Sequence, residues 1–347
     1  QALTITTTGW GAATYEKDHK YYQDKSRYLG ISPYVQHKFQ LNEALAITLG
    51  ARYDYSHYDF DNKLAASEND GYGNRRLADR SDSFSHLSPK ASVNYLLNDD
   101  SSVYARYANS FRIPTVGSLY HLKSADTDSA IGGVDPETSD TYEVGYKLNH
   151  NDFTFDAAIY YMDVDDAIVR AYDDNGQSYS VNAGRAVHKG IELAALWNMN
   201  EQVSINLAFS KSSHEYDHYV LDQGRTDWQG NDQSLDLSGK DMVMAPDYVV
   251  NFRLNYQPKN IEGLTTLLEV KNIGSYWMDA KNTKSYSGYT IANLKAFYQI
   301  NEQLSLNARV INITDKKYAQ QAEERYGNVN YAPGAPRTAY VGLTYRW

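Results

Sequence analysis

A small set of acidic side chains could hold a metal ion. Asp163, Asp165 and Asp166, followed by Asp173-Asp174-Asn175-Gly176, carry oxygen donors of the kind that Ca²⁺ prefers. Their spacing does not complete a calcium-binding loop. We therefore interpret them as solvated loop carboxylates and expect no bound metal ion.

Hydrolytic chemistry would need a histidine beside an acidic or hydroxyl partner. His150, His188 and His214 are the candidates, and none has a convincing partner in the sequence. The chain also lacks a Gly-x-Ser-x-Gly elbow, a phosphate-binding loop and a paired-histidine metal motif. We expect no enzymatic activity, no catalytic residue and no cofactor.

Aromatic and charged side chains gather in the polar segments that separate the patterned stretches. Trp228, Trp277, Tyr286, Arg325 and Tyr326 could stack on an anionic, aromatic solute and pair with its charge. The alternative for the Trp and Tyr residues is a girdle of rings at a membrane interface.

The composition favours a protein at a boundary between water and lipid. There are 32 Tyr against 9 Phe and 5 Trp in 347 residues, and a tyrosine ring can sit in such a boundary with its hydroxyl wet. Mean hydropathy is −0.62, and no run approaches the ~18 apolar residues of a membrane helix, which excludes a helical membrane protein. The absence of cysteine excludes disulfides and thiolate metal sites, and the net charge of −10 argues against a nucleic-acid partner.

The elements that position these residues are amphipathic strands, best seen at the C-terminus. In steps of two, the residues from Ala339 to Trp347 are apolar, and those from Thr338 to Arg346 are polar apart from Tyr340 and Gly342. The apolar face needs a cover. In a sandwich this would be a second sheet, and in an outer-membrane barrel it would be lipid.

The same alternation recurs along the chain and predicts about fourteen strands, beginning with a stretch from Leu3 to Tyr15. Tight turns such as Leu41-Asn42-Glu43 alternate with long polar loops such as residues 214–244. A sandwich has no reason to keep this alternation, whereas barrels have short periplasmic turns and long outer loops. We therefore predict an all-β fold, an antiparallel transmembrane β-barrel that takes up residues 1–347.

Charged residues at the polar positions of these strands are predicted to line the lumen. They could dock an internal domain through ion pairs, or simply solvate a polar interior. They are Arg52, Arg106, Glu143, Lys147, Glu192, Arg253, Glu269, Lys271, Lys295 and Arg309.

Several short stretches follow one another at barrel spacing along the chain: YANSFRIPT (107–115), DPETSDTYEVG (135–145), NAGR (182–185) leading to GIE (190–192), INITDKKY (311–318) and PGAPR (333–337). Together they resemble the C-terminal part of the TonB-dependent outer-membrane receptors of Gram-negative bacteria. The resemblance implies a 22-stranded barrel closed by an N-terminal plug domain. Because the chain supplies about fourteen strands, we expect the C-terminal part of such a barrel, with the plug and first strands missing; a nicked half or a smaller complete barrel are the alternatives.

The resemblance implies a multi-pass receptor in the outer membrane, in contact with lipid and lipopolysaccharide. It would import a scarce, large solute, and TonB would act through the missing plug. A ferric siderophore leads as cargo; haem, cobalamin, other metal chelates and sugars stay open. A passive fourteen-stranded channel and an outer-membrane barrel hydrolase are the competing interpretations.

The loop after the YANSFRIPT stretch is the expected ligand vestibule. Haem receptors of the family carry a ligand histidine near a Phe-Arg-Ala-Pro pattern, and this chain has Phe-Arg-Ile-Pro with His121 eight residues after Ile113. Arg112, Tyr120 and His121 are therefore predicted substrate-binding residues. The alternatives are a strand end set by Pro114 and a solvated loop histidine.

Overall fold

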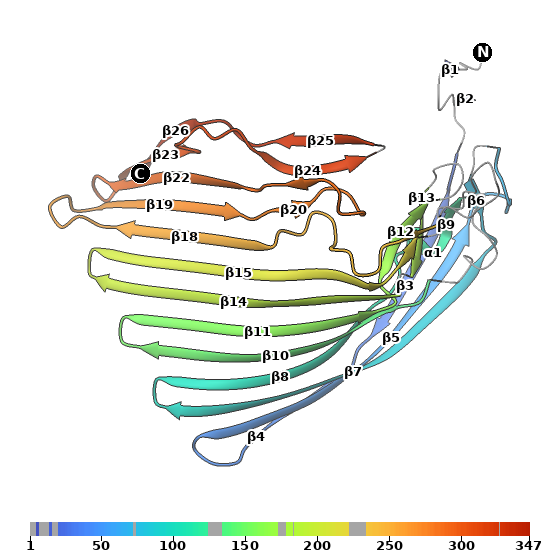
Figure 1. The fold of residues 1–347 in the computed structure, drawn as a ribbon, viewed down its shortest axis with the longest axis horizontal. Helices are drawn as coiled ribbons and strands as arrows, with labels where there is room; N and C mark the ends of the chain where they lie inside the picture. Colours follow the sequence, from blue (N-terminus) through green and yellow to red (C-terminus); the bar gives the residue numbers. More distant parts are fainter. Residues whose placement is uncertain are drawn as a thin grey trace.

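The fold is one antiparallel sheet of fourteen strands, which Figure 1 shows as a strongly curved wall. The computed structural model describes residues 5–6, 14–15, 20–71, 74–123, 134–172, 178–182, 184–221, 234–325 and 327–347. Strands that are consecutive in the sheet pair with each other, from β26 at one edge to β3 at the other. The strands are β3 (Asp24–Ile31), β4 (Tyr34–Gln40), β5 (Leu45–Asn62), β7 (Arg80–Asn98), β8 (Ser101–Arg112), β10 (Glu137–His150), β11 (Phe153–Asp165), β14 (Arg185–Asn200), β15 (Val203–His218), β18 (Tyr248–Tyr256), β19 (Leu264–Ile273), β22 (Tyr289–Gln299), β23 (Leu304–Ile311) and β26 (Thr338–Tyr345).

The short turns lie at one end of the wall and the longer connections at the other, which we call the turn end and the loop end (Figure 1). The predicted alternation is confirmed. Several turns close in the same way, because an asparagine side-chain oxygen accepts hydrogen bonds from groups two and three residues later. These asparagines are Asn42, Asn98, Asn200 and Asn301.

The two faces of the sheet differ as the alternation predicts. One row, for example, runs across paired strands through Val93, Ala105, Val144, Ile159 and Ile191. Large apolar side chains on this face stay exposed, as lipid-facing residues of a barrel do. The opposite, concave face carries most of the charged residues within the sheet and is called the lumen face below.

The count of fourteen is right, but most of the N-terminal strand predicted from Leu3 to Tyr15 lies outside the described residues, and its four described residues are not part of the main sheet. Ile5–Thr6 (β1) pairs only with Thr14–Tyr15 (β2), in a small sheet of their own. The fourteenth strand arises because a single predicted strand is split: β3 and β4 both pair with β5 and are separated by Ser32 and Pro33. Proline has no N–H to continue the ladder, so the strand breaks there.

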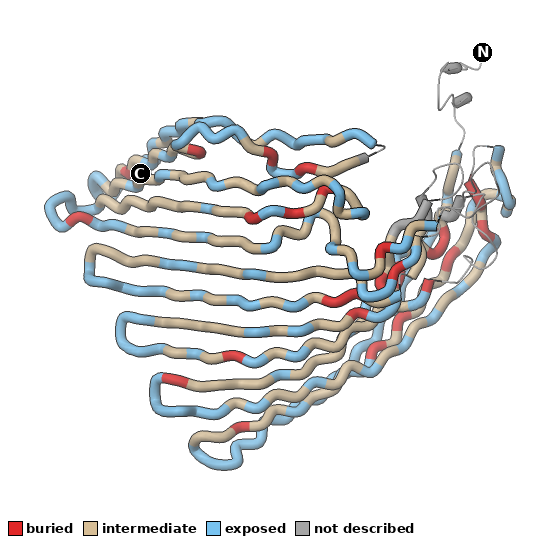
Figure 2. Tube along the Cα trace, in the orientation of Figure 1, coloured by how far each residue is buried: buried red, intermediate tan, exposed pale blue. Residues whose placement is uncertain are grey.

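Most of the buried side chains lie at the loop end, where short elements fold over the strand ends (Figure 2). These elements are α1 (Val116–Tyr120), the pair of strands β6 (Asn74–Arg76) and β9 (His121–Lys123), and the hairpins β12 (Ile168–Tyr172) with β13 (Ser178–Asn182), β16 (Val220–Leu221) with β17 (Leu235–Asp236), β20 (Tyr276–Trp277) with β21 (Ser285–Tyr286), and β24 (Ala319–Arg325) with β25 (Asn328–Pro333). Within the described ranges, no helix is long and apolar enough to cross a membrane.

Asn312 shows how a loop is fixed to the strand that precedes it. The residue is fully buried and has a left-handed backbone, with a φ of 52°. Its side-chain amide donates to the carbonyl oxygens of Lys316 (2.9 Å) and Ala335 (3.0 Å), and its side-chain oxygen accepts from the Lys316 N–H at 2.9 Å. One side chain therefore ties the end of β23 to the base of the β24–β25 hairpin.

Candidate functional site

At the loop end, α1 packs on the lumen face of β5 and β7. Its side chains Leu119 and Tyr120 form a buried cluster with Phe60 and Leu77. The Tyr120 ring is fully buried and stacked on Phe60, with ring centroids 4.4 Å apart. Its hydroxyl donates to Asp82 at 2.8 Å, and burial together with this bond raises the pKa of the phenol. Tyr120 thus holds α1 in place, and its ring is not accessible to a solute in this conformation.

His121 follows α1 and is also held by neighbours. Its Nε2 lies 3.0 Å from a carboxylate oxygen of Asp24, and its ring stacks on Tyr22 with centroids 4.6 Å apart. The ring is partly exposed, so it remains a candidate for ligand contact. In the structure its partners are a carboxylate and a phenol ring.

Arg112 lies at the end of β8 and is the most open of these candidates. Its guanidinium donates to Glu137 at 2.6 Å while the side chain stays 60% exposed. Glu137 also accepts the backbone N–H of Ile168 at 3.0 Å. Glu137 therefore orders the neighbouring loop and leaves Arg112 free to turn its remaining donors toward an anionic solute.

Trp277 and Tyr286 are brought together on the β20–β21 hairpin. The Tyr276 and Tyr286 rings contact each other at a tilt of 50° with centroids 5.3 Å apart, and the Tyr286 hydroxyl accepts the Ala319 N–H at 2.9 Å. The Trp277 indole donates to Asp241 at 3.0 Å. Both predicted rings thus join separate loops, and each keeps part of its surface exposed. Trp228, Tyr326 and the side chain of Arg325 lie outside the described residues.

The acidic residues at the end of β11 have partners that compete with a calcium ion. Arg185 forms a two-bond ion pair with Asp163. Asp166 begins the connection to β12, and burial raises the pKa of its carboxyl group, with added repulsion from Asp135 and Asp165. In the parts of the chain that the structure describes, no group of three or more His, Asp or Glu side chains is arranged to hold a metal ion.

The predicted lumen-wall residues form ion pairs between neighbouring strands. Glu269 on β19 links two cations, with Arg253 at 3.3 Å on β18 and Lys295 at 2.6 Å on β22. Farther along the same face of the sheet, Glu143 on β10 lies 3.7 Å from Arg106 on β8 and accepts a hydrogen bond from Tyr104. These carboxylates are largely shielded while their cationic partners remain about half exposed.

The other predicted lumen-wall residues have more varied surroundings. Lys147 pairs with Asp156 at 2.9 Å, and Arg52 pairs with Asp54 at 2.7 Å. The Arg309 guanidinium lies 4.3 Å from the centre of the Tyr340 ring. The two remaining residues, Glu192 and Lys271, stand opposite Ala158 and Asn251 in the paired strands.

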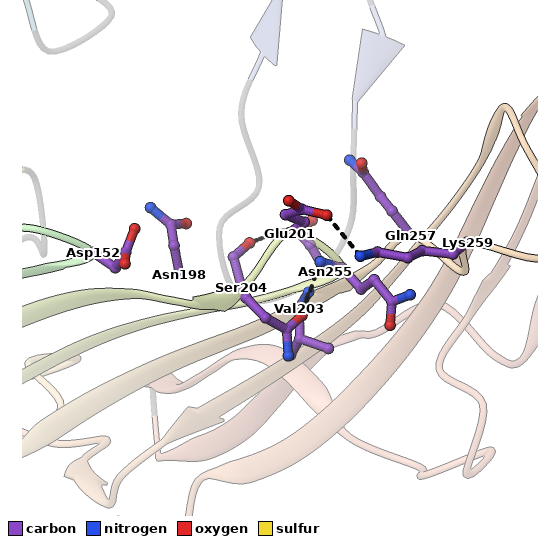
Figure 3. Close-up of a pocket in the computed structure, with 10 residues that line it drawn as sticks. Asp152, Asn198, Glu201, Val203, Ser204, Asn255, Gln257 and Lys259 are labelled. Carbon is purple, nitrogen blue, oxygen red and sulfur yellow. Dashed lines mark hydrogen bonds and ion pairs between the residues drawn. The ribbon is translucent and has the colours of Figure 1, made fainter.

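A polar cavity of about 820 Å³ lies at the turn end, beside the β14–β15 and β18–β19 turns (Figure 3). Glu201 and Lys259, from the two turns, form an ion pair of 2.7 Å across it, which lowers the pKa of the Glu201 carboxyl group. Asn255 donates to Ser204 at 3.2 Å in the same wall. Amide, hydroxyl and charged groups dominate the lining, so the cavity suits a hydrated polypeptide surface better than an apolar ligand.

Two residues that the sequence did not single out as a site meet on the lumen face at the loop end. His188 on β14 and His214 on β15 are directly opposite in the sheet register, with their Nδ1 atoms 2.6 Å apart. The sequence separates them by 26 positions, and each lacked an obvious partner. Only the pairing of β14 with β15 shows that each is the other's partner.

Comparison with known proteins gives a consistent family. A family model described as TonB dependent receptor-like, beta-barrel matches residues 4–313. The vitamin B12 transporter BtuB of Photobacterium profundum is 25% identical over 308 residues, covering 87% of this chain and 43% of that protein. The metal-pseudopaline receptor CntO of Pseudomonas aeruginosa is 24% identical over 315 residues, covering 89% and 40%. The chain thus spans less than half the length of these relatives, which are a transporter and a receptor rather than enzymes.

A solved structure shows the same fold. The ferric yersiniabactin uptake receptor FyuA from Yersinia pestis superimposes with a TM-score of 0.70 at 19% sequence identity. The match covers 93% of this chain and 46% of the receptor.

Proposed function

The chain belongs to the family of TonB-dependent receptor β-barrels, and from that premise we propose that it is the C-terminal barrel portion of an outer-membrane receptor for a ferric siderophore. A barrel of this family implies an outer-membrane protein. The proposal adds a Gram-negative host, contact with lipid and lipopolysaccharide, and TonB acting through a plug domain.

The observation that carries the proposal is the division of the sheet into two faces. The outer face offers exposed apolar side chains to lipid, and the lumen face carries ion pairs such as Glu269 with Arg253. Because the Arg and Lys side chains of these pairs remain about half exposed, they keep N–H donors that can bind the polar surface of a plug domain. They support docking of a plug against the lumen wall, as does the polar cavity at the turn end.

The loop end would capture the cargo. Arg112 keeps an exposed guanidinium at the end of β8, and Trp277 and Tyr286 keep part of their ring surface exposed on the β20–β21 hairpin, elsewhere in the same loop layer. A cation and aromatic rings suit an anionic, aromatic chelate of iron. The relatives are named for different cargos, vitamin B12, metal-pseudopaline and ferric yersiniabactin, so a cobalamin or another metal chelate is the second candidate.

Uptake under iron limitation tests the proposal. A strain lacking the receptor is complemented with it and supplied with iron-labelled siderophores, haem or labelled vitamin B12, each in a TonB-competent and a TonB-deficient background. Uptake of one ferric siderophore that requires TonB is expected. Uptake that persists without TonB would indicate a passive channel, and uptake of vitamin B12 or haem alone would replace the siderophore as cargo.

The intact mass and N-terminal sequence of the receptor isolated from the outer membrane test whether these 347 residues are part of a longer, plugged receptor. A receptor with residues before Gln1, or a co-purifying N-terminal piece, is expected. A single species of these 347 residues that forms barrels alone would contradict the plugged receptor.

A further inference from the structure

The histidine pair at the loop end lies beyond the apolar band of the outer face. On β14 the outward residue Ile191 is apolar, and the next outward residue toward the loop end is Lys189, whose amine lies 3.2 Å from Glu215. His188 and His214 lie past this row on the lumen side, and both rings are half-buried. Part of each ring therefore remains accessible.

The two rings are held so that nitrogen faces nitrogen. Their Nδ1 atoms are 2.6 Å apart and their ring centroids 4.9 Å apart. On the far side of its ring, His214 Nε2 lies 3.0 Å from the Ser212 hydroxyl. When Nε2 donates its proton to that hydroxyl, Nδ1 of His214 accepts a hydrogen bond from Nδ1–H of His188. A shift of the His188 proton from Nδ1 to Nε2 then leaves both Nδ1 lone pairs for a metal ion, with Ser212 as the outer partner that orients His214.

The surroundings favour the neutral form of both rings while supplying negative charge nearby. Burial lowers the pKa of His188, helped by His214, and burial lowers the pKa of His214. Glu137 acts on His188 and Asp241 on His214 in the opposite direction. Two neutral imidazoles flanked by carboxylates suit a divalent cation better than a second proton, because a second proton would place two positive rings in contact.

We propose that His188 and His214 bind one divalent transition-metal ion through their Nδ1 atoms. A metal–nitrogen distance of about 2.0–2.1 Å places two imidazole nitrogens on one ion roughly 3 Å apart, so the nitrogens must separate by about 0.4 Å and the rings must turn until both lone pairs point at the ion. Imidazole ligands select borderline metals, and Cu²⁺ binds most tightly in the divalent series. With no third His, Asp or Glu in place among the described residues, water or a donor atom of an incoming chelate completes the coordination.

Copper binding by the purified, untagged receptor in detergent tests this site, and the test does not depend on transport. Wild-type protein is compared with His188→Gln, His214→Gln and His150→Gln by calorimetry and by electron paramagnetic resonance of bound Cu²⁺. His150 is the matched control because it is exposed at the last position of β10, at the opposite end of the wall, beside Asp100. Glutamine keeps a polar side chain of similar length, and thermal unfolding confirms that each variant folds.

One high-affinity Cu²⁺ per chain is expected, with hyperfine structure from two nitrogens. Each variant of the pair should weaken binding at least tenfold, the His150 variant should not, and Mg²⁺ should not compete. Absence of high-affinity binding, or equal binding by wild type and both pair variants, would overturn the site and leave the histidines as a hydrogen-bonded pair that only joins β14 to β15.

Discussion

Replacing Tyr120 with Phe should loosen α1 without disturbing the barrel. The substitution keeps the ring on Phe60 and removes only the hydroxyl that donates to Asp82 at 2.8 Å. A hydrogen bond to a charged group contributes about 1.5–3 kcal/mol, and the lower figure applies because Asp82 keeps its ion pair with Arg80. A loss of about 1.5 kcal/mol raises the opening constant of α1 roughly tenfold.

Hydrogen exchange measured by mass spectrometry on residues 114–123 reads this opening directly. Amides of α1 should exchange about tenfold faster in Tyr120→Phe, while amides of β10 and β11 should not change. Tyr58→Phe is the matched control, because the Tyr58 ring packs in the same cluster but its hydroxyl lies at a weak 3.5 Å from the Pro114 carbonyl. Exchange in Tyr120→Phe within twofold of wild type, or equal acceleration in both variants, would refute the role given to the Asp82 bond.

Three further changes test other parts of the structure. Asn312→Ala should cost about 3 kcal/mol locally, because it removes three hydrogen bonds of about 1 kcal/mol each; exchange at residues 314–337 should rise, and no rise would contradict the role given to Asn312. Glu269→Gln should lower the denaturant midpoint by the equivalent of about 1–2 kcal/mol, since its two cationic partners then face each other; a double-mutant cycle with either partner that shows no coupling would refute it. The lowered pKa values of His188 and His214 make the folded state bind fewer protons than the unfolded state, so stability falls as pH drops below the ordinary value near 6.5. Between about pH 7.5 and about pH 5.5, the unfolding midpoint should fall less in the variant with both histidines replaced by Gln than in the wild type. The same dependence of the midpoint on pH in both proteins would contradict the assignment of this pH effect to the histidine pair.

The fold was predictable because it depends on a local pattern. Alternation of apolar and polar residues defines a strand, and the strict order of turns and loops defines which strands pair. The exceptions arise where the local pattern is not decisive. The stretch from Leu3 to Tyr15 is rich in Thr and Gly, and its described residues pair outside the main sheet. Pro33 interrupts a strand whose alternation continues on both sides of it.

The candidate site was less predictable, because its residues meet through contacts between distant segments. Charge at alternate positions predicted Glu143 and Glu269 as lumen-facing residues, and in the structure each pairs with a cation on a neighbouring strand. Nothing in the sequence indicated that Tyr120 would be buried by Phe60, 60 positions earlier. The same holds for His188 and His214, whose partnership depends on the register of β14 against β15.

Two of the stretches that revealed the family, NAGR and INITDKKY, stabilise the loop end. In INITDKKY, Asn312 satisfies backbone groups on both sides of the last loop. In NAGR, Asn182 bonds to the backbone of Asp135 and Asp166, and Arg185 pairs with Asp163. Any receptor of this architecture needs such staples where long loops leave the strands, whatever it carries. We therefore expect the side chains that distinguish one cargo from another at other positions of the loop end, such as the exposed Arg112 and the pair of His188 with His214.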